Sequence, residues 1–559
     1  DPEGFWAEVA QEFKWHKPWK RVLDWNFEEP NVKWCVGGKT NITENALDRH
    51  LRELGNHPAI IWEPNDPEEH HRMITYRDLH HKVCQFANVL KNNGVKKGDR
   101  VCIYMGMVPE LAIAVLACAR IGAIHSVIFG GFSAQSIADR LKDAQALTVI
   151  TCDGAYRGNK EISLKGVIDD ALVQCPFVSK VIVLTRTHTP VSMLKGRDVW
   201  WDDEIRKIET LGLNDCPAEE MDAEDPLFIL YTSGSTGKPK GVVHTCAGYM
   251  VYTTYSFVNV FQYNPGDIHF CTADIGWITG HSYILYGPLG AGATTLMFEG
   301  VPTWPDAGRF WQIVDEYKVN ILYTAPTAIR SLMGYGLGPV NAHNLSSLKV
   351  LGSVGEPINE EAWQWLNENI GKGKCPIVDT WWQTETGGVM ISNLAGVTPA
   401  KPSYATLPLP GVDPMLVDDA GNEILGNNVT GNLCIRHPWP SIIRTTYGDH
   451  ERCRTNYFAT YPNLYFTGDG CYRDEQGNYR ITGRVDDVLN VSGHRIGTAE
   501  VENAINMHTG VVESAVVGYP HDIKGQGIYA YVTLMAGEKP SEALRKARLY
   551  LLLPSAHAD

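Results

Sequence analysis

One ten-residue segment, Tyr231 to Lys240, concentrates side chains that could bind a polyphosphate. It reads Tyr-Thr-Ser-Gly-Ser-Thr-Gly-Lys-Pro-Lys and follows the apolar run Leu227-Phe228-Ile229-Leu230, which has the length and bulk of a buried strand. Glycine lets backbone N–H groups approach an anion, hydroxyls donate further hydrogen bonds, and ammonium groups offset negative charge. We therefore predict that this segment cradles the phosphates of a nucleotide.

The spacing of this segment differs from that of a Walker loop. A Walker loop reads Gly-x-x-x-x-Gly-Lys-Ser/Thr, whereas Gly234 and Gly237 are three residues apart and Pro239 follows Lys238. This difference argues against a P-loop kinase. A polar surface turn is the other interpretation, since Ser, Thr, Gly and Pro are common turn formers. A turn, however, rarely needs so many donors together with two cations.

Four further motifs follow in order along the chain. Gly355-Glu356-Pro357 follows a strand-like run, residues 379–385 read Asp-Thr-Trp-Trp-Gln-Thr-Glu after another, residues 465–469 read Tyr-Phe-Thr-Gly-Asp, and residues 483–487 read Gly-Arg-Val-Asp-Asp. Together with residues 231–240, this set resembles the signature of the adenylate-forming superfamily, which contains acyl-CoA synthetases, luciferases and peptide-synthetase adenylation domains.

Within that superfamily the chain resembles the acetyl-CoA synthetases. The similarity rests on Trp15 to Asp24, Asn41, Asn45, residues 47–50 and residues 276–283, and it extends to about Pro540. It implies an ATP-dependent acetate–CoA ligase. Acetate would attack the α-phosphorus of ATP and release pyrophosphate, and the thiol of coenzyme A would then attack the acyl carbon and release AMP. Two easier steps would thus replace one hard step, because a carboxylate alone is a poor electrophile.

The resemblance implies an ATP- and AMP-binding set with named roles. Asp469 would accept hydrogen bonds from the ribose hydroxyls, a task that suits a carboxylate. Arg484 would bind the ribose from the other side, and Arg495 would meet the phosphate. The catalytic residues would be Thr232, Lys240, Thr384, Glu385 and Arg495. The whole nucleotide set is Thr232, Ser233, Gly234, Ser235, Thr236, Gly237, Lys238, Lys240, Gly355, Glu356, Pro357, Asp379, Thr380, Trp381, Trp382, Gln383, Thr384, Asp469, Arg484 and Arg495.

Two further pockets are implied for the acyl group and for coenzyme A. A tryptophan at the floor of the acyl pocket would leave room for a methyl or ethyl group, because overpacking by one methylene costs about 1–3 kcal/mol. The alternative is that Trp381 and Trp382 only fill a core. The acyl pocket would be formed by Ile278, Thr279, Val354 and Trp382. The coenzyme A site would contain Arg157, Gly158, Asn159, Lys160, Thr279, Thr303, Ser492 and Gly493, with Thr303 standing where many relatives have asparagine.

The resemblance also implies a metal ion and a hinge. Glu385 would carry Mg²⁺, and a second cation would bind at Asn506, His508 and Val511. A small domain would swing about Asp486. The superfamily carries a lysine in a Pro-x-Thr-x-Ser-Gly-Lys motif near its carboxy terminus, and no such motif follows Pro540. We therefore expect the small domain to be incomplete and the first half-reaction to be slowed, by about 10²–10³.

Composition narrows the class of protein and its partners. The formal net charge of −15 argues against a nucleic-acid partner, whose backbone would be repelled. Thirteen cysteines without a Cys-x-x-Cys pair fit free or buried thiols in a reducing compartment. The apolar stretch Leu111–Phe129 is interrupted by polar residues and predicts a core helix and strand, so no membrane partner is expected. We expect a cytoplasmic location, with the mitochondrial matrix as the alternative because the chain starts at Asp1.

The elements that position these motifs alternate between helix and strand. The spacing predicts helices over 78–90 and 111–119, and strands over 100–104 and 123–129. Such alternation predicts an α/β fold of mostly parallel, helix-flanked sheets, whose nucleotide sites lie at the carboxyl ends of strands. Residues 1–485 would form the large domain, with a small β-subdomain and an N-terminal extension, and residues 486–559 a small α+β domain.

Two other functions stay open at this point. The chain could be a propionate or other short-chain acyl-CoA ligase, because hydrophobic pockets discriminate one methylene by only about 10–200-fold. It could also be a non-catalytic protein that binds AMP or an acyl-adenylate. The first is separated by a series of acids of increasing length, and the second by nucleotide binding without thioester formation.

Overall fold

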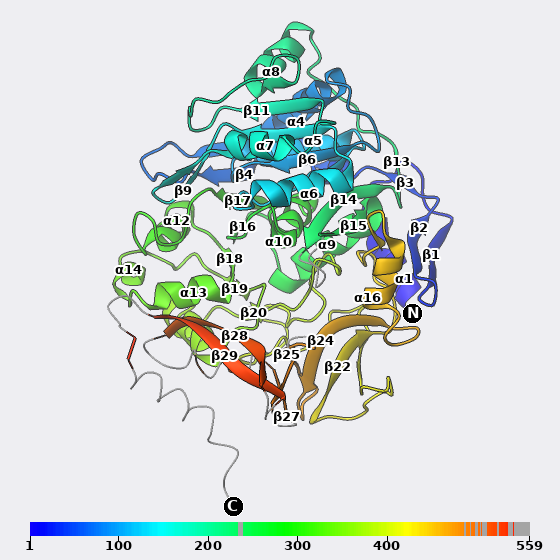
Figure 1. The fold of residues 1–559 in the computed structure, drawn as a ribbon, viewed down its shortest axis with the longest axis vertical. Helices are drawn as coiled ribbons and strands as arrows, with labels where there is room; N and C mark the ends of the chain where they lie inside the picture. Colours follow the sequence, from blue (N-terminus) through cyan, green and yellow to red (C-terminus); the bar gives the residue numbers. More distant parts are fainter. Residues whose placement is uncertain are drawn as a thin grey trace, which may run out of the picture.

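In its described residues, the computed structural model has two large sheets packed with helices, two four-stranded antiparallel sheets and three two-stranded ones (Figure 1). It describes residues 1–232, 239–485, 488–491, 494–497, 501–502, 505, 511–521, 525–534 and 540–541. The predicted α/β class with largely parallel sheets is confirmed. The assignment of residues 486–559 to a separate domain stays a prediction.

The first large sheet has eight strands and ends in an antiparallel hairpin. Six neighbouring strands pair in parallel, whereas β14–β15 and β15–β23 pair antiparallel. The antiparallel pair β14–β15 ends with Thr232 opposite Lys240. In spatial order the strands are β12 (Asp198–Trp200), β11 (Lys180–Leu184), β8 (Thr148–Cys152), β6 (Arg100–Tyr104), β7 (Ile124–Val127), β14 (Pro226–Thr232), β15 (Lys240–Thr245) and β23 (Thr445–Thr446).

The second large sheet has seven strands, all parallel except the edge strand β5. Its strands β19 and β20 end beside each other, which brings the residues after them to one edge. In spatial order the strands are β20 (Ile377–Asp379), β19 (Val350–Ser353), β18 (Ile321–Thr324), β16 (Ile268–Cys271), β17 (Thr294–Phe298), β4 (Pro58–Glu63) and β5 (Arg72–Thr75).

Helices cover these sheets as the alternating pattern predicts. The helix over Tyr76–Asn92 starts with a capping box between Thr75 and Asp78, and the helix over Pro109–Arg120 has proline at its first turn. Figure 1 shows α4 to α7 beside β6 and β11. The helices are α1 (Pro2–Gln11), α2 (Ile42–Ala46), α3 (Leu51–Leu54), α4 (Tyr76–Asn92), α5 (Pro109–Arg120), α6 (Ala134–Ala144), α7 (Leu164–Leu172), α8 (Trp201–Thr210), α9 (Cys246–Phe261), α10 (Ile278–Gly280), α11 (Gly287–Gly290), α12 (Arg309–Tyr317), α13 (Pro326–Met333), α14 (Gly338–Asn341), α15 (Glu360–Trp365) and α16 (His450–Tyr457).

Smaller sheets complete the molecule. The antiparallel sheet β21 (Pro414–Val417), β22 (Val429–Ile435), β24 (Tyr465–Arg473) and β25 (Tyr479–Arg484) is the predicted β-subdomain. A second antiparallel sheet contains β27 (His494–Gly497), β26 (Val488–Val491), β29 (Gly525–Leu534) and β28 (Val511–His521). Two-stranded pairs are formed by β1 (Arg21–Asn26) with β2 (Asn31–Val36), β3 (Lys39–Thr40) with β13 (Met221–Asp222), and β9 (Ala155–Arg157) with β10 (Lys160–Ile162).

Buried apolar residues from most of residues 1–485 form the hydrophobic core. One cluster of buried residues extends from Trp6 to Tyr479, and a second fills the far side of the seven-stranded sheet. All thirteen cysteines are buried and unpaired, which confirms the expectation of free thiols. No helix in the described part of the chain is both long and apolar enough to cross a bilayer.

Candidate active site

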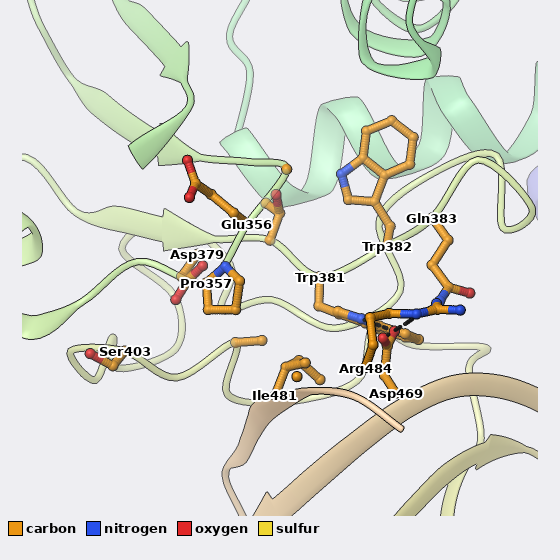
Figure 2. A pocket seen from close by; sticks show the side chains of 14 residues that line it. Glu356, Pro357, Asp379, Trp381, Trp382, Gln383, Ser403, Asp469, Ile481 and Arg484 are labelled. Carbon is orange, nitrogen blue, oxygen red and sulfur yellow. Dashed lines mark hydrogen bonds and ion pairs between the residues drawn. The ribbon is translucent and has the colours of Figure 1, made fainter. Parts of the chain in front are cut away.

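A cavity of about 290 Å³ lies between the seven-stranded sheet and the β-subdomain (Figure 2). One wall comes from residues that follow β19 and β20, and the other from β24 and β25. These strands are far apart in the sequence, and the fold brings their ends together. The cavity is lined by Gly355, Glu356, Pro357, Asp379, Thr380, Trp381, Trp382, Gln383, Ser403, Ala405, Asp469, Ile481, Gly483 and Arg484. Ten of these were predicted as nucleotide-binding residues; Ser403, Ala405 and Ile481 belong to no motif, and Gly483 opens the motif 483–487 but was not in the predicted set.

Asp469 is the best-anchored carboxylate in this cavity. It is 6% exposed, and its Oδ2 accepts hydrogen bonds from Trp381 Nε1 at 3.1 Å and from Gln383 Nε2 at 2.8 Å. Arg484 Nη1 lies 3.5 Å from the other oxygen, Oδ1. Burial raises the pKa of Asp469 to about 6, and Arg484 opposes that rise. The arrangement leaves an oriented carboxylate that can accept hydrogen bonds from a ligand in the cavity.

The raised pKa predicts that binding of a sugar weakens in acid. The Asp469 carboxylate takes up a proton as pH falls through about 6 and then loses acceptor capacity. The affinity for adenosine is expected to fall about tenfold from pH 7 to pH 5. Adenosine is the probe because it carries no phosphate that titrates in this range. Calorimetry on the Asp469→Asn variant should show weaker binding with a flatter pH profile, whereas constant affinity in the unmutated protein would contradict the role of Asp469.

Three other predicted residues of the cavity, Asp379, Thr380 and Glu356, differ in their surroundings. Burial raises the pKa of Asp379 to about 7. The hydroxyl of Thr380 donates to the carbonyl of Ser353 at 2.7 Å. The Glu356 carboxylate accepts hydrogen bonds from Thr327 and Arg330, so its charge is directed away from a ligand. Glu356 therefore lines the cavity through its backbone and the methylene groups of its side chain.

Lys240 and Glu385 form a buried pair next to this cavity. Lys240 Nζ lies 2.8 Å from Glu385 Oε1, and both side chains are 12% exposed. The hydroxyl of Tyr457 donates to the same carboxylate oxygen, and the Lys240 ammonium lies 4.9 Å from the centre of the Tyr457 ring. Burial favours a raised pKa for Glu385, but the charge and hydrogen bond of Lys240 hold that pKa below its ordinary value. A cation and an anion are therefore kept together where the loop 380–386 leaves the cavity.

Tyr457 was not predicted from the sequence. It ends α16, 72 residues beyond Glu385, and stacks on Tyr465 with ring centroids 5.6 Å apart. No motif marks it, because only the packing of α16 against β24 places it near Glu385.

Removing the Tyr457 hydroxyl is expected to loosen this pair. A hydrogen bond to a charged group contributes about 1.5–3 kcal/mol. In acetate-dependent ATP–pyrophosphate exchange, the Tyr457→Phe variant should therefore have a kcat/KM for ATP that is about tenfold lower than that of the unmutated protein. Tyr472→Phe, which removes a hydroxyl that bonds Asn428 at 3.0 Å on the surface, serves as the matched control. Equal rates for both variants would contradict a role for Tyr457.

His244 holds the loop 380–386 by a hydrogen bond to its backbone. Its Nε2 lies 2.7 Å from the carbonyl oxygen of Thr384, and burial lowers its pKa to about 4. The neutral ring therefore donates through Nε2. The amide N–H of Ile443 donates to the carbonyl of Glu385 at 2.8 Å. Thr384 and Glu385 are thus held at two backbone positions, by residues that the sequence did not single out.

The described part of the polyphosphate segment fits an anion. Thr232 ends β14, and its buried hydroxyl has no hydrogen-bond partner among the described residues. Lys240 opens β15 on the opposite strand. Ser233, Gly234, Ser235, Thr236, Gly237 and Lys238 lie outside the described residues, as do Asp486, Ser492, Gly493, Asn506 and His508. Arg495 lies on β27 and Val511 begins β28.

Of the predicted acyl-pocket residues, Ile278 and Val354 are buried and Trp382 is partly buried. Trp382 packs edge-on against Tyr283, with ring centroids 5.1 Å apart, and its Nε1 donates to the hydroxyl of Tyr323 at 3.2 Å. Ile278 and Val354 belong to the hydrophobic cluster against which Trp382 packs, and Thr279 is half-buried. Trp382 also lines the cavity, so a ligand there would meet its ring.

Four of the predicted coenzyme A residues, Arg157 to Lys160, lie at the turn of the hairpin β9–β10. Arg157, Asn159 and Lys160 are exposed, and Gly158 is buried between them. Gly158 lies against the segment that contains Thr303, since a Cβ there would come within 3.3 Å of Val301. Arg157 lines a second cavity of about 210 Å³ together with Tyr156 and Glu299.

Comparison with known proteins gives one consistent result. The family described as AMP-binding enzyme matches residues 47–444, Acetyl-coenzyme A synthetase N-terminus matches residues 1–46, and AMP-binding enzyme C-terminal domain matches residues 500–550. The last match passes Pro540, so the expectation that the similarity ends there is wrong.

Individual relatives cover almost the whole chain. The chain is 56% identical to an acetyl-coenzyme A synthetase of Alkalilimnicola ehrlichii, over 99% of this chain and 85% of that protein. It is 60% identical to an acetyl-coenzyme A synthetase of Parvibaculum lavamentivorans, over 98% and 84%. Its fold matches that of acetoacetyl-CoA synthetase from Streptomyces lividans with a TM-score of 0.88 at 24% identity, over 98% of this chain and 82% of that one.

Proposed function

This chain belongs to the AMP-binding enzyme family and, within it, to the acetyl-coenzyme A synthetases, and we propose that it joins acetate to coenzyme A using ATP. The observation that carries the proposal is the single cavity in which the motif residues 355–357, 379–383, Asp469 and Arg484 meet. Relatives with this one name match 98–99% of the chain, which does not favour the propionate ligase or the non-catalytic alternative.

In the first half-reaction the cavity would hold the adenosine part of ATP. Asp469 would accept hydrogen bonds from the ribose hydroxyls, with Arg484 beside it. The walls at Gly355–Pro357 and Asp379–Trp381 would enclose the base, and Thr384 would contact the α-phosphate. Lys240 and Thr232, paired at the end of β14 and β15, would face the β- and γ-phosphates. The protein would act mainly by positioning the acetate oxygen and by offsetting charge.

Magnesium fits this arrangement through one carboxylate. Mg²⁺ is usually bound by one or two carboxylates together with substrate phosphates. Glu385 supplies such a group, buried and ionised. When bound, the ion would neutralise phosphate charge. Lys240, which now pairs with Glu385, would be available to the phosphates once the carboxylate has another cation.

In the second half-reaction the thiol of coenzyme A would attack the acyl carbon and release AMP. The cations Arg157 and Lys160 would hold this polyanionic substrate at the hairpin β9–β10. The residues 486–559 would form a small domain that turns about Asp486 and brings Arg495, Ser492 and Gly493 to the site. A cytoplasmic location is supported by the thirteen unpaired thiols.

Product analysis tests the proposed function. The chain, incubated with ATP, Mg²⁺, acetate and coenzyme A, should form AMP, pyrophosphate and acetyl-CoA in equal amounts, as measured by chromatography. Butyrate should replace acetate poorly. Formation of ADP and phosphate, or AMP without thioester, would contradict it.

A further inference from the structure

The side chain of Asn65 clamps the backbone of Gly158 with two hydrogen bonds. Asn65 Nδ2 donates to the Gly158 carbonyl at 2.9 Å, and the Gly158 N–H donates to Asn65 Oδ1 at 2.8 Å. Asn65 is 3% exposed and lies 93 residues away in the sequence. One carboxamide thus satisfies both backbone groups of a buried turn residue.

The turn at Gly158 needs hydrogen bonds from outside the hairpin to hold its position. Gly158 has φ of +61°, a conformation that favours glycine, and it connects β9 and β10. Within the described part of the chain, these strands pair only with each other, over three residue pairs. A two-stranded hairpin of this size is barely stable alone. Its position must therefore be fixed by contacts with the rest of the protein.

Asn65 is itself held by a buried ion pair. Its N–H donates to Glu299 Oε2 at 3.2 Å, and Arg186 binds Glu299 through Nη2 at 2.6 Å and Nε at 2.8 Å. The guanidinium of Arg186 also lies 4.9 Å from the centre of the Tyr156 ring, which belongs to β9. The network therefore contacts the hairpin at two residues, one on each side of Arg157.

The hairpin presents two cations on adjacent strands. Arg157 and Lys160 are a registered pair directly beside Gly158, and both are exposed. Arg157 also lines the cavity that Glu299 borders. We propose that Asn65 is a positioning residue: by fixing the turn at Gly158, it holds Arg157 and Lys160 where they can bind coenzyme A. Asn65 therefore affects thioester formation but not adenylation. This inference rests on the proposed function.

The two half-reactions separate this role from a general structural one. Acetate-dependent ATP–pyrophosphate exchange needs no coenzyme A, whereas acetyl-CoA formation does. In Asn65→Ala, the KM for coenzyme A is expected to rise about tenfold, while the exchange rate stays within twofold of the unmutated protein. With pantetheine, a thiol without the phosphates, the variant and the unmutated protein should have the same KM, because the cations would hold the phosphates.

Two further variants sharpen the test. Asn65→Asp keeps the acceptor for the Gly158 N–H but places an oxygen against the Gly158 carbonyl, so its KM for coenzyme A should rise at least as much. Asn65→Ser, which can bond only one of the two groups, is measured in the same way and stands in for alanine if that variant is recovered unfolded. Asn41→Ala removes an equally buried amide that bonds three carbonyls elsewhere, and should lower stability without changing this KM.

The outcomes are distinguishable. An unchanged KM for coenzyme A in Asn65→Ala, or an equal loss in exchange and in thioester formation, would overturn the inference alone. Absence of acetyl-CoA from the unmutated protein would instead overturn the proposed function on which it rests.

Discussion

Replacing Lys240 by alanine is expected to slow acetate-dependent ATP–pyrophosphate exchange by about 10²–10³-fold. Lys240 is the described cation of the polyphosphate segment, and it lies on a strand that is buried and paired on both sides. In the Lys240→Ala variant, a water molecule could occupy the place of the ammonium group, but it would carry no charge and would not be held in a fixed position. The cost should therefore fall on the rate of the chemical step more than on adenosine affinity.

The same substitution should change the state of Glu385. Without Lys240, burial dominates and the pKa of the Glu385 carboxyl rises. A carboxylate left unpaired in a buried site is also destabilising, by about 3–5 kcal/mol. Thermal unfolding of Lys240→Ala should therefore occur at lower temperature, and the exchange rate should fall further as pH is lowered.

Two controls make the Lys240 result specific. Lys240→Arg keeps the charge and should recover much of the stability but little of the rate, because a planar guanidinium does not replace a point charge. Lys349→Ala removes an ion pair with Asp267 on the exposed end of β19 and should leave exchange unchanged. An exchange rate in Lys240→Ala within threefold of the unmutated protein would contradict the assigned role.

Replacing Trp382 by alanine is expected to reverse the preference for short acids. The Trp382 ring packs edge-on against Tyr283 and its Nε1 donates to the Tyr323 hydroxyl, so its loss would open space at the proposed acyl pocket. Each buried methylene contributes about 0.8 kcal/mol, so three additional methylenes in pentanoate would gain roughly 2.4 kcal/mol, or about 60-fold, over acetate. The activity with acetate should fall at the same time, because a methyl group no longer fills the pocket.

The measurement is kcat/KM for straight-chain acids from acetate to hexanoate. Trp381→Phe is the matched control: it removes the indole N–H that bonds Asp469, so it should raise the KM for ATP and leave the order of acids unchanged. If Trp382→Ala keeps the acetate preference of the unmutated protein, another residue limits the acyl pocket.

Residues that belong to continuous motifs could be predicted from the sequence. The runs before Thr232, Gly355 and Asp379 are strands, and the predicted helices over 78–90 and 111–119 lie within α4 and α5. A strand followed by glycine and hydroxyl residues is a local pattern, so its type and position are readable without the fold. The parallel sheets then place such strand ends at one edge.

Residues that act through distant partners could not be predicted. Tyr457 reaches Glu385, His244 reaches Thr384 and Asn65 reaches Gly158, across 72, 140 and 93 residues. Each is a single polar side chain without a spacing pattern. Its partner is decided by how helices and strands pack, and the sequence alone does not contain that geometry in a local form.

The most direct test of the central claim uses acetate labelled with ¹⁸O in its carboxyl group. If the cavity holds an acyl-adenylate, one labelled oxygen remains on the α-phosphorus, and the AMP released with coenzyme A present carries one ¹⁸O by mass spectrometry. The pyrophosphate carries none. Label in phosphate or pyrophosphate, or unlabelled AMP accompanying acetyl-CoA, would contradict the claim that acetate attacks the α-phosphorus at this site.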